Sequence, residues 1–263
     1  MKLPKQVAIV SKLILCFGFV ASMSFTLIDD KKIFDTKAIK SSTFMVKLKA
    51  EREKEITAMC KAKGVKFPIK NLFIRIFKAD KSLEIWALDN TSTSYKLVKS
   101  YPLQNFDAGA GPKFNADDEQ IPEGVYAINA FDTAFNDFPA VKLNWPNKAD
   151  KLNGDNDTMK QDIFIYGGNE NMGKIPLSGE SDISRDIFYI TFKAYELSKG
   201  IIPVHIFPFK MGKKEMKLAK ETYASNITSI QFWDNLQPVY QKFESNKRLP
   251  IITIDKRGRY LVK

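Results

Sequence analysis

The sequence predicts a mainly β protein of the α+β class, in which helices lie before, within and after a strand-rich region. Short apolar and alternating runs dominate residues 70–210, and a period of two is typical of strands. Apolar residues recur at helical spacing near both ends of the chain. The 263 residues contain no internal repeat and no low-complexity linker, so we expect one main domain with appended elements.

Residues 1–24 have the pattern of an export signal. Three lysines, at positions 2, 5 and 12, accompany an apolar run over 13–23, and small residues at 21, 22 and 24 offer a cleavage site. This run is shorter than the roughly 20 residues needed to cross a membrane. A lipid anchor on Cys16 is disfavoured because Leu15, rather than a small residue, precedes it. The sequence therefore predicts export to the periplasm or cell envelope.

An N-terminal helical segment is expected over residues 33–66. Ser41, Ser42 or Thr43 can cap its helix, and Gly64 can end it in the left-handed conformation. Cys60 lies near the end of this helix among apolar neighbours, and we expect it to be packed rather than reactive.

The strand-rich domain is expected over residues 70–210 and begins with a hairpin that turns at residues 79–82. One helix, over 182–197, is inserted between the last two strands. The expected strands are 72–78, 83–88, 95–101, 125–129, 162–166 and 202–207.

A helical and hairpin extension is expected over residues 211–263. Two amphipathic helices, 213–225 and 228–243, are followed by a hairpin whose strands, 251–255 and 259–262, flank a Lys-Arg-Gly turn. Asn226 can cap the second helix, and Pro238 can kink it.

Composition excludes several classes of site. Two cysteines and one histidine rule out a Cys/His zinc cluster and a disulfide framework. The polar stretch 153–157 lacks the acidic residue that completes a calcium loop, so a polar turn is expected there. No metal or cofactor is therefore expected. The net charge of +11 comes without a nucleic-acid-binding signature. The basic clusters 213–217 and 256–259 are typical of solvated faces, and contact with a membrane or an anionic wall polymer is the alternative.

An ordered set of short strings carries a family resemblance. Together they resemble the bacterial L,D-transpeptidases of the YkuD type, in the YafK-like branch. The strings are IRIFK (74–78), LEIW (83–86), GPK (111–113), Asp118 with QIPEGVY (120–126), WPN (145–147) with Asp150, IYGG (165–168) and PVHIFPFK (203–210).

The resemblance implies a YkuD-like β-sandwich with an inserted helix, exported to the envelope, that acts on the peptide stems of peptidoglycan. Its members use a cysteine nucleophile and a histidine base within a His-Gly, loop, Ser-x-Gly-Cys pattern. In this chain, Gly167, Gly168 and Gly173 match that pattern. The positions of the histidine, serine and cysteine are occupied by Tyr166, Asn171 and Lys174, respectively.

These substitutions remove the chemistry of the family. A lysine amine with a pKa of about 10.4 is almost wholly protonated at pH 7, and its attack on an amide would form another stable amide. A tyrosine phenol with a pKa of about 10 is a poor base. His205 lies in the strand string 203–207, where the family does not place its base, and it is expected to be structural.

Two main hypotheses follow. In the first hypothesis, the chain is a catalytically inactive homologue. It binds peptidoglycan stem peptides, or regulates wall metabolism, through the loop that contains Gly167, Gly168 and Gly173. Alternatively, it is an active transpeptidase, carboxypeptidase or other acyl-transfer enzyme with a non-standard nucleophile. A less favoured third hypothesis is a single attachment through Lys174 as an isopeptide. The sequence leaves the oligomeric state open.

Overall fold

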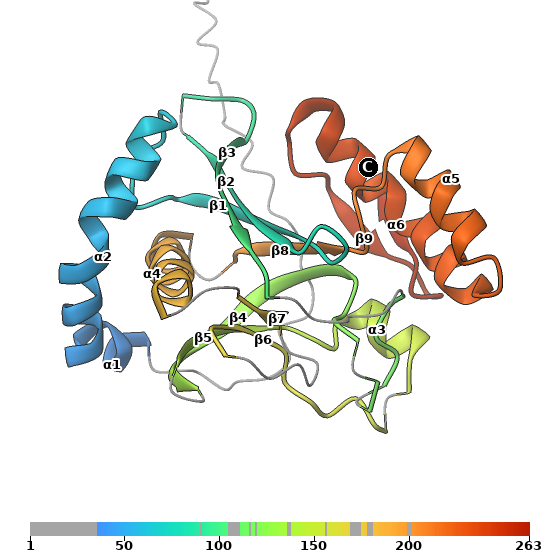
Figure 1. Ribbon diagram of the computed structural model, residues 1–263, viewed down its shortest axis with the longest axis horizontal. Coiled ribbons are helices and arrows are strands. Elements are labelled where there is room, and N and C mark those ends of the chain that lie inside the picture. The colour runs from blue at the N-terminus through green and yellow to red at the C-terminus, as the bar shows by residue number, and fades with distance from the viewer. Residues whose placement is uncertain are drawn as a thin grey trace, which may run out of the picture.

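The computed structural model describes residues 36–89, 91–104, 111–115, 117–118, 120–135, 138–155, 157–168, 175–177, 181–198 and 201–263 (Figure 1). The predicted signal segment, 1–24, lies outside these residues. An eight-stranded mixed sheet with helices on both sides forms the fold, with strand order β3-β2-β1-β8-β4-β5-β6-β7, and this confirms the predicted α+β class.

The first half of the sheet follows the predicted strands. β1 (Asn71–Phe77), β2 (Ser82–Leu88) and β3 (Lys96–Pro102) form an antiparallel meander, and the expected hairpin turn joins the first two strands. β8 (Pro203–Phe207) then lies parallel to β1. Most side chains of β1 and β8 are buried, as expected for central strands covered on both faces.

The second half of the sheet continues through β4 (Gly124–Phe135). This twelve-residue strand pairs with β8 at its beginning and with β5 (Phe138–Leu143) towards its end. β6 (Phe164–Tyr166) and the two-residue β7 (Ile175–Pro176) complete the sheet. The first group of strands, β1–β3 with β8, and the second group, β4–β7, are thus joined in one hydrogen-bonded sheet.

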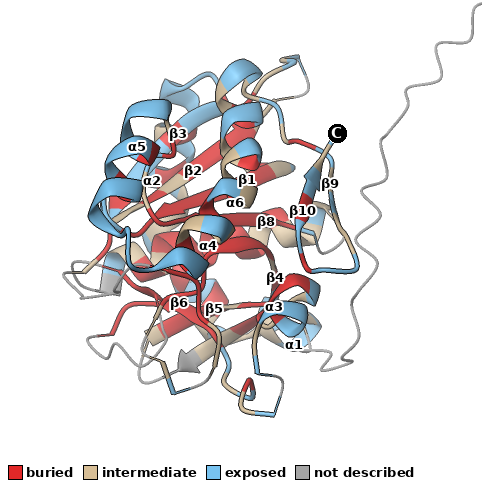
Figure 2. Ribbon diagram, turned by 90° about the vertical axis from the view of Figure 1, so that its right-hand side faces the viewer, coloured by how far each residue is buried: buried red, intermediate tan, exposed pale blue. Residues whose placement is uncertain are grey.

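Helix α4 (Ser181–Ser198) is the predicted insertion, and it lies inside the core. Every residue from 187 to 192 is buried, so this part of the helix contacts protein all around its circumference. It packs with the strands in the main apolar cluster, and α2 (Thr43–Ala62) covers its outer side (Figure 1). Figure 2 shows the strands of the sheet largely buried. The Arg52 side chain ties α2 to α4 through Asp186, at 2.8 Å.

The caps of the N-terminal helices confirm local predictions. A short helix, α1 (Thr36–Ser41), precedes α2, and the Ser42 hydroxyl at the N-cap of α2 accepts a hydrogen bond from the Met45 N–H. Gly64 follows the helix with φ +65°, the left-handed conformation expected of it.

The C-terminal elements cover the opposite face of the sheet (Figure 1). α5 (Lys213–Thr222) ends before the predicted residue 225, and α6 (Ile227–Asn246) contains Pro238 and begins at the predicted cap, Asn226. β9 (Ile252–Ile254) and β10 (Tyr260–Val262) form the expected hairpin. Trp233 of α6 and Tyr260 of β10 pack with Phe77 and Phe207 of the sheet.

Three elements were not anticipated: β5, β7 and the short helix α3 (Lys148–Asn153). Asn147 and Asp150 form a capping box at the start of α3. The stretch that follows α3 turns through hydrogen bonds to Asp155, which agrees with the polar turn expected there. Within the described ranges, no three His, Cys, Asp or Glu side chains are grouped to hold a metal ion. None of the helices seen in the described part of the chain is both long and apolar enough to cross a membrane.

Candidate functional site

Tyr166, at the position expected for a catalytic base, ends β6 inside the sheet. β5 lies on one side of this strand and β7 on the other, and the Tyr166 carbonyl accepts a hydrogen bond from the Leu177 N–H at 2.8 Å. Its side chain is fully buried in a small cluster with Ala140 and Phe164. The phenol therefore belongs to the packed interior and is not presented to solvent.

The two glycines that follow Tyr166 are required by close packing. A Cβ atom added to Gly168 would lie 2.3 Å from Cε2 of the Tyr166 ring. One added to Gly167 would lie 2.7 Å from Oγ of Ser184, on α4. Real Cβ atoms do not approach other atoms this closely, so the two glycines allow the backbone at 167–168 to lie against the Tyr166 ring and against α4.

The remaining predicted site residues, Asn171, Gly173 and Lys174, lie outside the described residues. The structure describes the two ends of that loop. Gly168 precedes it, and Ile175 follows it in β7, opposite Ile165 of β6.

The chain's single histidine is a core residue. His205 of β8 is 1% exposed, and its ring meets Phe73 edge-on at 4.7 Å between centroids. Burial, together with the neighbouring Arg75 charge, lowers its pKa to about 3, so the imidazole is neutral. Neither ring nitrogen has a hydrogen-bond partner among the described residues. The structural role expected for His205 is consistent with this environment.

Cys60 is the cysteine of the described chain, and it is fully buried on α2. Burial raises the pKa of its thiol to about 11, which disfavours the thiolate needed for nucleophilic attack. The packed role expected from the sequence agrees with this.

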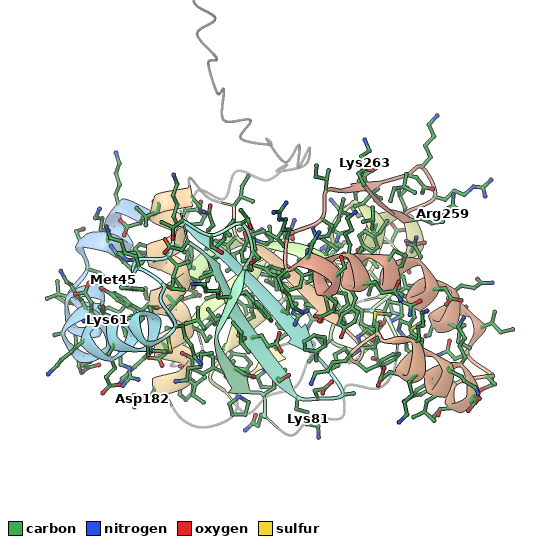
Figure 3. All side chains as sticks on the ribbon, turned by 90° about the horizontal axis from the view of Figure 1, so that it is seen from above. Met45, Lys61, Lys81, Asp182, Arg259 and Lys263 are labelled. Carbon is green, nitrogen blue, oxygen red and sulfur yellow. The ribbon has the colours of Figure 1, made fainter. Side chains whose placement is uncertain are left out.

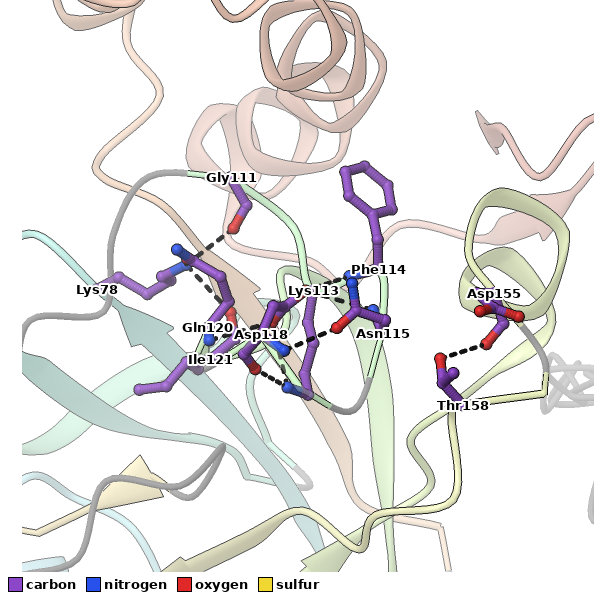
Figure 4. A network of polar contacts seen from close by, with 10 residues as sticks. All are labelled: Lys78, Gly111, Lys113, Phe114, Asn115, Asp118, Gln120, Ile121, Asp155 and Thr158. Carbon is purple, nitrogen blue, oxygen red and sulfur yellow. Dashed lines mark hydrogen bonds and ion pairs between the residues drawn. The ribbon is translucent and has the colours of Figure 1, made fainter.

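A buried polar network holds several strings of the resemblance together (Figure 4). Lys78, at the end of β1, donates hydrogen bonds to the carbonyl oxygens of Gly111 and Ile121. It also forms a 2.8 Å ion pair with Glu123, whose side chain is fully buried. The other Glu123 carboxylate oxygen accepts a 2.7 Å hydrogen bond from the Trp233 indole N–H of α6. The network therefore joins the sheet, the loop before β4 and the C-terminal helices.

Asp118 organises the neighbouring turn (Figure 4). Its carboxylate accepts hydrogen bonds from the backbone N–H groups of Phe114 and Gln120 and pairs with Lys113 at 3.1 Å. Burial lowers the pKa of Lys113, and Asp118 partly offsets this effect. These contacts make Asp118 the residue that holds this turn together.

Asp150 and Tyr126 form a second buried pair, at 2.9 Å between the phenol oxygen and the carboxylate. Burial raises the pKa of Asp150 to about 7, although hydrogen bonds from Asn147 and Tyr126 oppose the shift. Asp150 and Tyr126 belong to the strings that carry the resemblance, which alone predict no role for either residue. The structure makes both of them supports of α3 and β4.

Sequence similarity to a curated protein agrees with the resemblance. No family model matches the chain. The chain is similar to the "Putative L,D-transpeptidase YafK" of Escherichia coli, in strains K12 and O157:H7, with 27% identity over 193 residues, or 73% of either protein. Among solved structures, the chain is similar to the helical cell shape determining protein Pgp2 from Campylobacter jejuni. The two share 15% identity over 70% of this chain and 73% of that chain, with a TM-score of 0.40. It is also similar to Bdellovibrio bacteriovorus Bd1075, with 19% identity, 66% and 63% covered, and a TM-score of 0.34. The similarity to YafK confirms the predicted relationship.

Proposed function

We propose that this chain, a homologue of YafK, is an exported protein of the cell envelope that binds the peptide stems of peptidoglycan and does not catalyse transpeptidation. The similarity to a protein named as an L,D-transpeptidase supports a role in peptidoglycan metabolism. The side chains at the catalytic positions support the loss of catalysis.

The burial of Tyr166 carries the proposal. A general base must come within hydrogen-bond reach of the group that it deprotonates. The Tyr166 ring is enclosed by Ala140 and Phe164, and Gly168 closes over its edge. A phenol held in this way supports the strand, and its burial favours a packing role over that of a base in an open groove.

Neither of the other candidate groups compensates. A reversible acyl carrier needs a thiolate beside an imidazole. Cys60 lies buried on α2 with a raised pKa, and His205 lies buried on β8 with a lowered pKa. Lys174 supplies an amine, and an amine would end the reaction as a stable amide.

Binding is tested by sedimentation of the chain from residue 25, which keeps every described residue, with purified peptidoglycan sacculi. We expect the parent protein to sediment with the sacculi and Gly173→Trp to bind several-fold less. Thr222→Trp, which adds the same ring at an exposed, uncharged position at the end of α5, is the matched control and should bind like the parent. If the parent protein stays in solution, the binding proposal is wrong.

Catalysis is tested separately, because the similarity to YafK also favours the second candidate, an active enzyme. The same chain is incubated with disaccharide tetrapeptide over a wide range of pH, and the products are analysed by mass spectrometry. We expect neither tripeptide nor cross-linked dimer. Repeated turnover would establish the enzyme instead. A stable mass increase of the protein that is lost in Lys174→Ala would establish single attachment.

A further inference from the structure

The β9–β10 hairpin is a small sheet with one covered face. Ile252, Ile254 and Val262 are partly buried and Tyr260 is buried, and all four pack on the cluster formed with α6. Because side chains alternate along a strand, the residues between them point away from the protein.

Both edges of the hairpin are occupied as well. The Asn235 side chain of α6 pairs with the N–H and the carbonyl of Tyr260, at 2.8 and 3.0 Å. On the other edge, Lys148 of α3 donates to the Ile254 carbonyl, at 3.3 Å. The hairpin is therefore fixed from below and from both sides, and its outward face is left open.

That outward face combines aliphatic side chains with cations. Ile251 and Leu261 are each 47% exposed. They lie close together because Leu261 pairs with Thr253 and the Lys263 N–H donates to the Ile251 carbonyl. We call the following set the outward face: Ile251, Leu261, Lys256, Arg257, Arg259 and Lys263. Figure 3 shows Arg259 and Lys263 projecting from this corner of the molecule.

The charge of this face is strongly one-sided. Among the side chains of residues 251–263, four are cationic and one is acidic, Asp255. The guanidinium of Arg259 already holds that carboxylate at 2.8 Å. Lys256, Arg257 and Lys263 are exposed. The face therefore complements a negatively charged surface.

We propose that the outward face of the β9–β10 hairpin docks on the surface of an anionic phospholipid membrane. Cations beside exposed aliphatic side chains are the combination that such an interface binds, since the cations meet the headgroups and the aliphatic groups enter the acyl boundary. A polyanion with no apolar layer would use only the cations. This proposal is independent of peptidoglycan binding.

The test is flotation of the chain from residue 25 with vesicles of phosphatidylcholine containing one quarter phosphatidylglycerol. Each cation near an anionic surface strengthens binding about fivefold. The triple variant Lys256→Gln, Arg257→Gln, Lys263→Gln should therefore bind about a hundredfold more weakly. Binding of the parent should fall steeply with added salt and be absent on pure phosphatidylcholine.

A matched control removes the same charge elsewhere. Lys54 and Lys61 on α2 and Lys63 just after it are exposed, and Lys61 lies on the other side of the molecule from Arg259 (Figure 3). Changing these three to Gln should alter vesicle binding less than twofold. If this control weakens binding as much as the hairpin variant does, general charge and not the outward face is responsible, and the proposal is wrong.

The aliphatic pair distinguishes lipid from a polymer. Ile251→Ser with Leu261→Ser keeps every charge and should weaken vesicle binding about tenfold, while binding to heparin, a polyanion without an apolar layer, should stay unchanged. Equal binding of this variant and the parent to the vesicles would overturn the membrane proposal, as would failure of the parent to bind vesicles. Thermal unfolding of each variant confirms that it is folded.

Discussion

Replacing Gly168 by alanine tests the packing that encloses Tyr166. The added methyl group would lie 2.3 Å from Cε2 and 3.1 Å from Cδ2 and Cζ of the ring. Gly168 does not have a positive φ, so the backbone accepts alanine and the cost comes from the ring alone. Overpacking of this kind costs about 1–3 kcal/mol. For a chain of this size, the thermal midpoint should fall by roughly 2–12 °C.

Measuring Gly168→Ala with and without the Tyr166 ring shows whether the ring causes the loss of stability. In Tyr166→Leu the aromatic ring is absent, and Gly168→Ala should then cost less than about 0.5 kcal/mol. The free energy of unfolding is measured by urea denaturation for the parent, the two single variants and the double variant, and the difference is their coupling energy. Equal costs in both backgrounds would refute the close packing of Gly168 against Tyr166.

Three further predictions concern buried groups. A thiol reagent at pH 8 should label Cys60, in the chain from residue 25, at least about a hundredfold more slowly in the folded than in the unfolded protein. Burial raises the pKa of the Cys60 thiol to about 11 and so removes the reactive thiolate. Equal labelling rates would contradict this. His205 has a folded pKa of about 3 against an ordinary 6.5, so its contribution to stability is present above pH 6.5 and is lost as the pH falls towards 3, by about 1.4 kcal/mol per pH unit. The pKa of Asp150 is raised from 3.8 to about 7, so its contribution to stability acts in the opposite sense and is lost as the pH rises from 3.8 to 7. Removing the histidine in His205→Phe should therefore make stability, measured by urea denaturation, fall with rising pH between 4 and 6.5. The same pH slope in this variant and the parent would refute the assignment. Glu123→Gln leaves the buried Lys78 side chain without its anion and should lower the free energy of unfolding, measured by urea denaturation, by about 3–5 kcal/mol. Adding Lys78→Met should recover part of this loss, and no recovery would argue against the pairing of the two residues.

Local signals were sufficient to predict much of the fold. Ser42 and Asn226 cap the helices that they were expected to cap, and the β1–β2 and β9–β10 hairpins follow from alternation and turn residues. β5 and β7 escaped prediction because β7 is two residues long and neither strand has a clear alternating pattern. The parallel pairing of β8 with β1 joins segments far apart in the sequence, which no local pattern encodes.

The candidate site was predictable in its residue types but not in its surroundings. The sequence placed Tyr166, Gly167 and Gly168 together, and the substitutions alone predicted weak chemistry. The burial of Tyr166 and the close packing of Gly167 could not be predicted, because the atoms that surround them come from other elements, such as Ala140 of β5 and Ser184 of α4. The buried charge of Glu123 was equally hidden, since its partners come from β1 and α6.

The two outermost strands of the eight-stranded sheet meet each other. Leu103, just after β3, forms a bridge with Leu177, just after β7, and the Gln104 N–H donates to the Pro176 carbonyl at 3.0 Å. Backbone groups that would otherwise be open to a foreign strand are satisfied at this junction, which protects the sheet against edge-to-edge pairing at this point. An extended peptide consequently cannot join the sheet at this junction as an added strand.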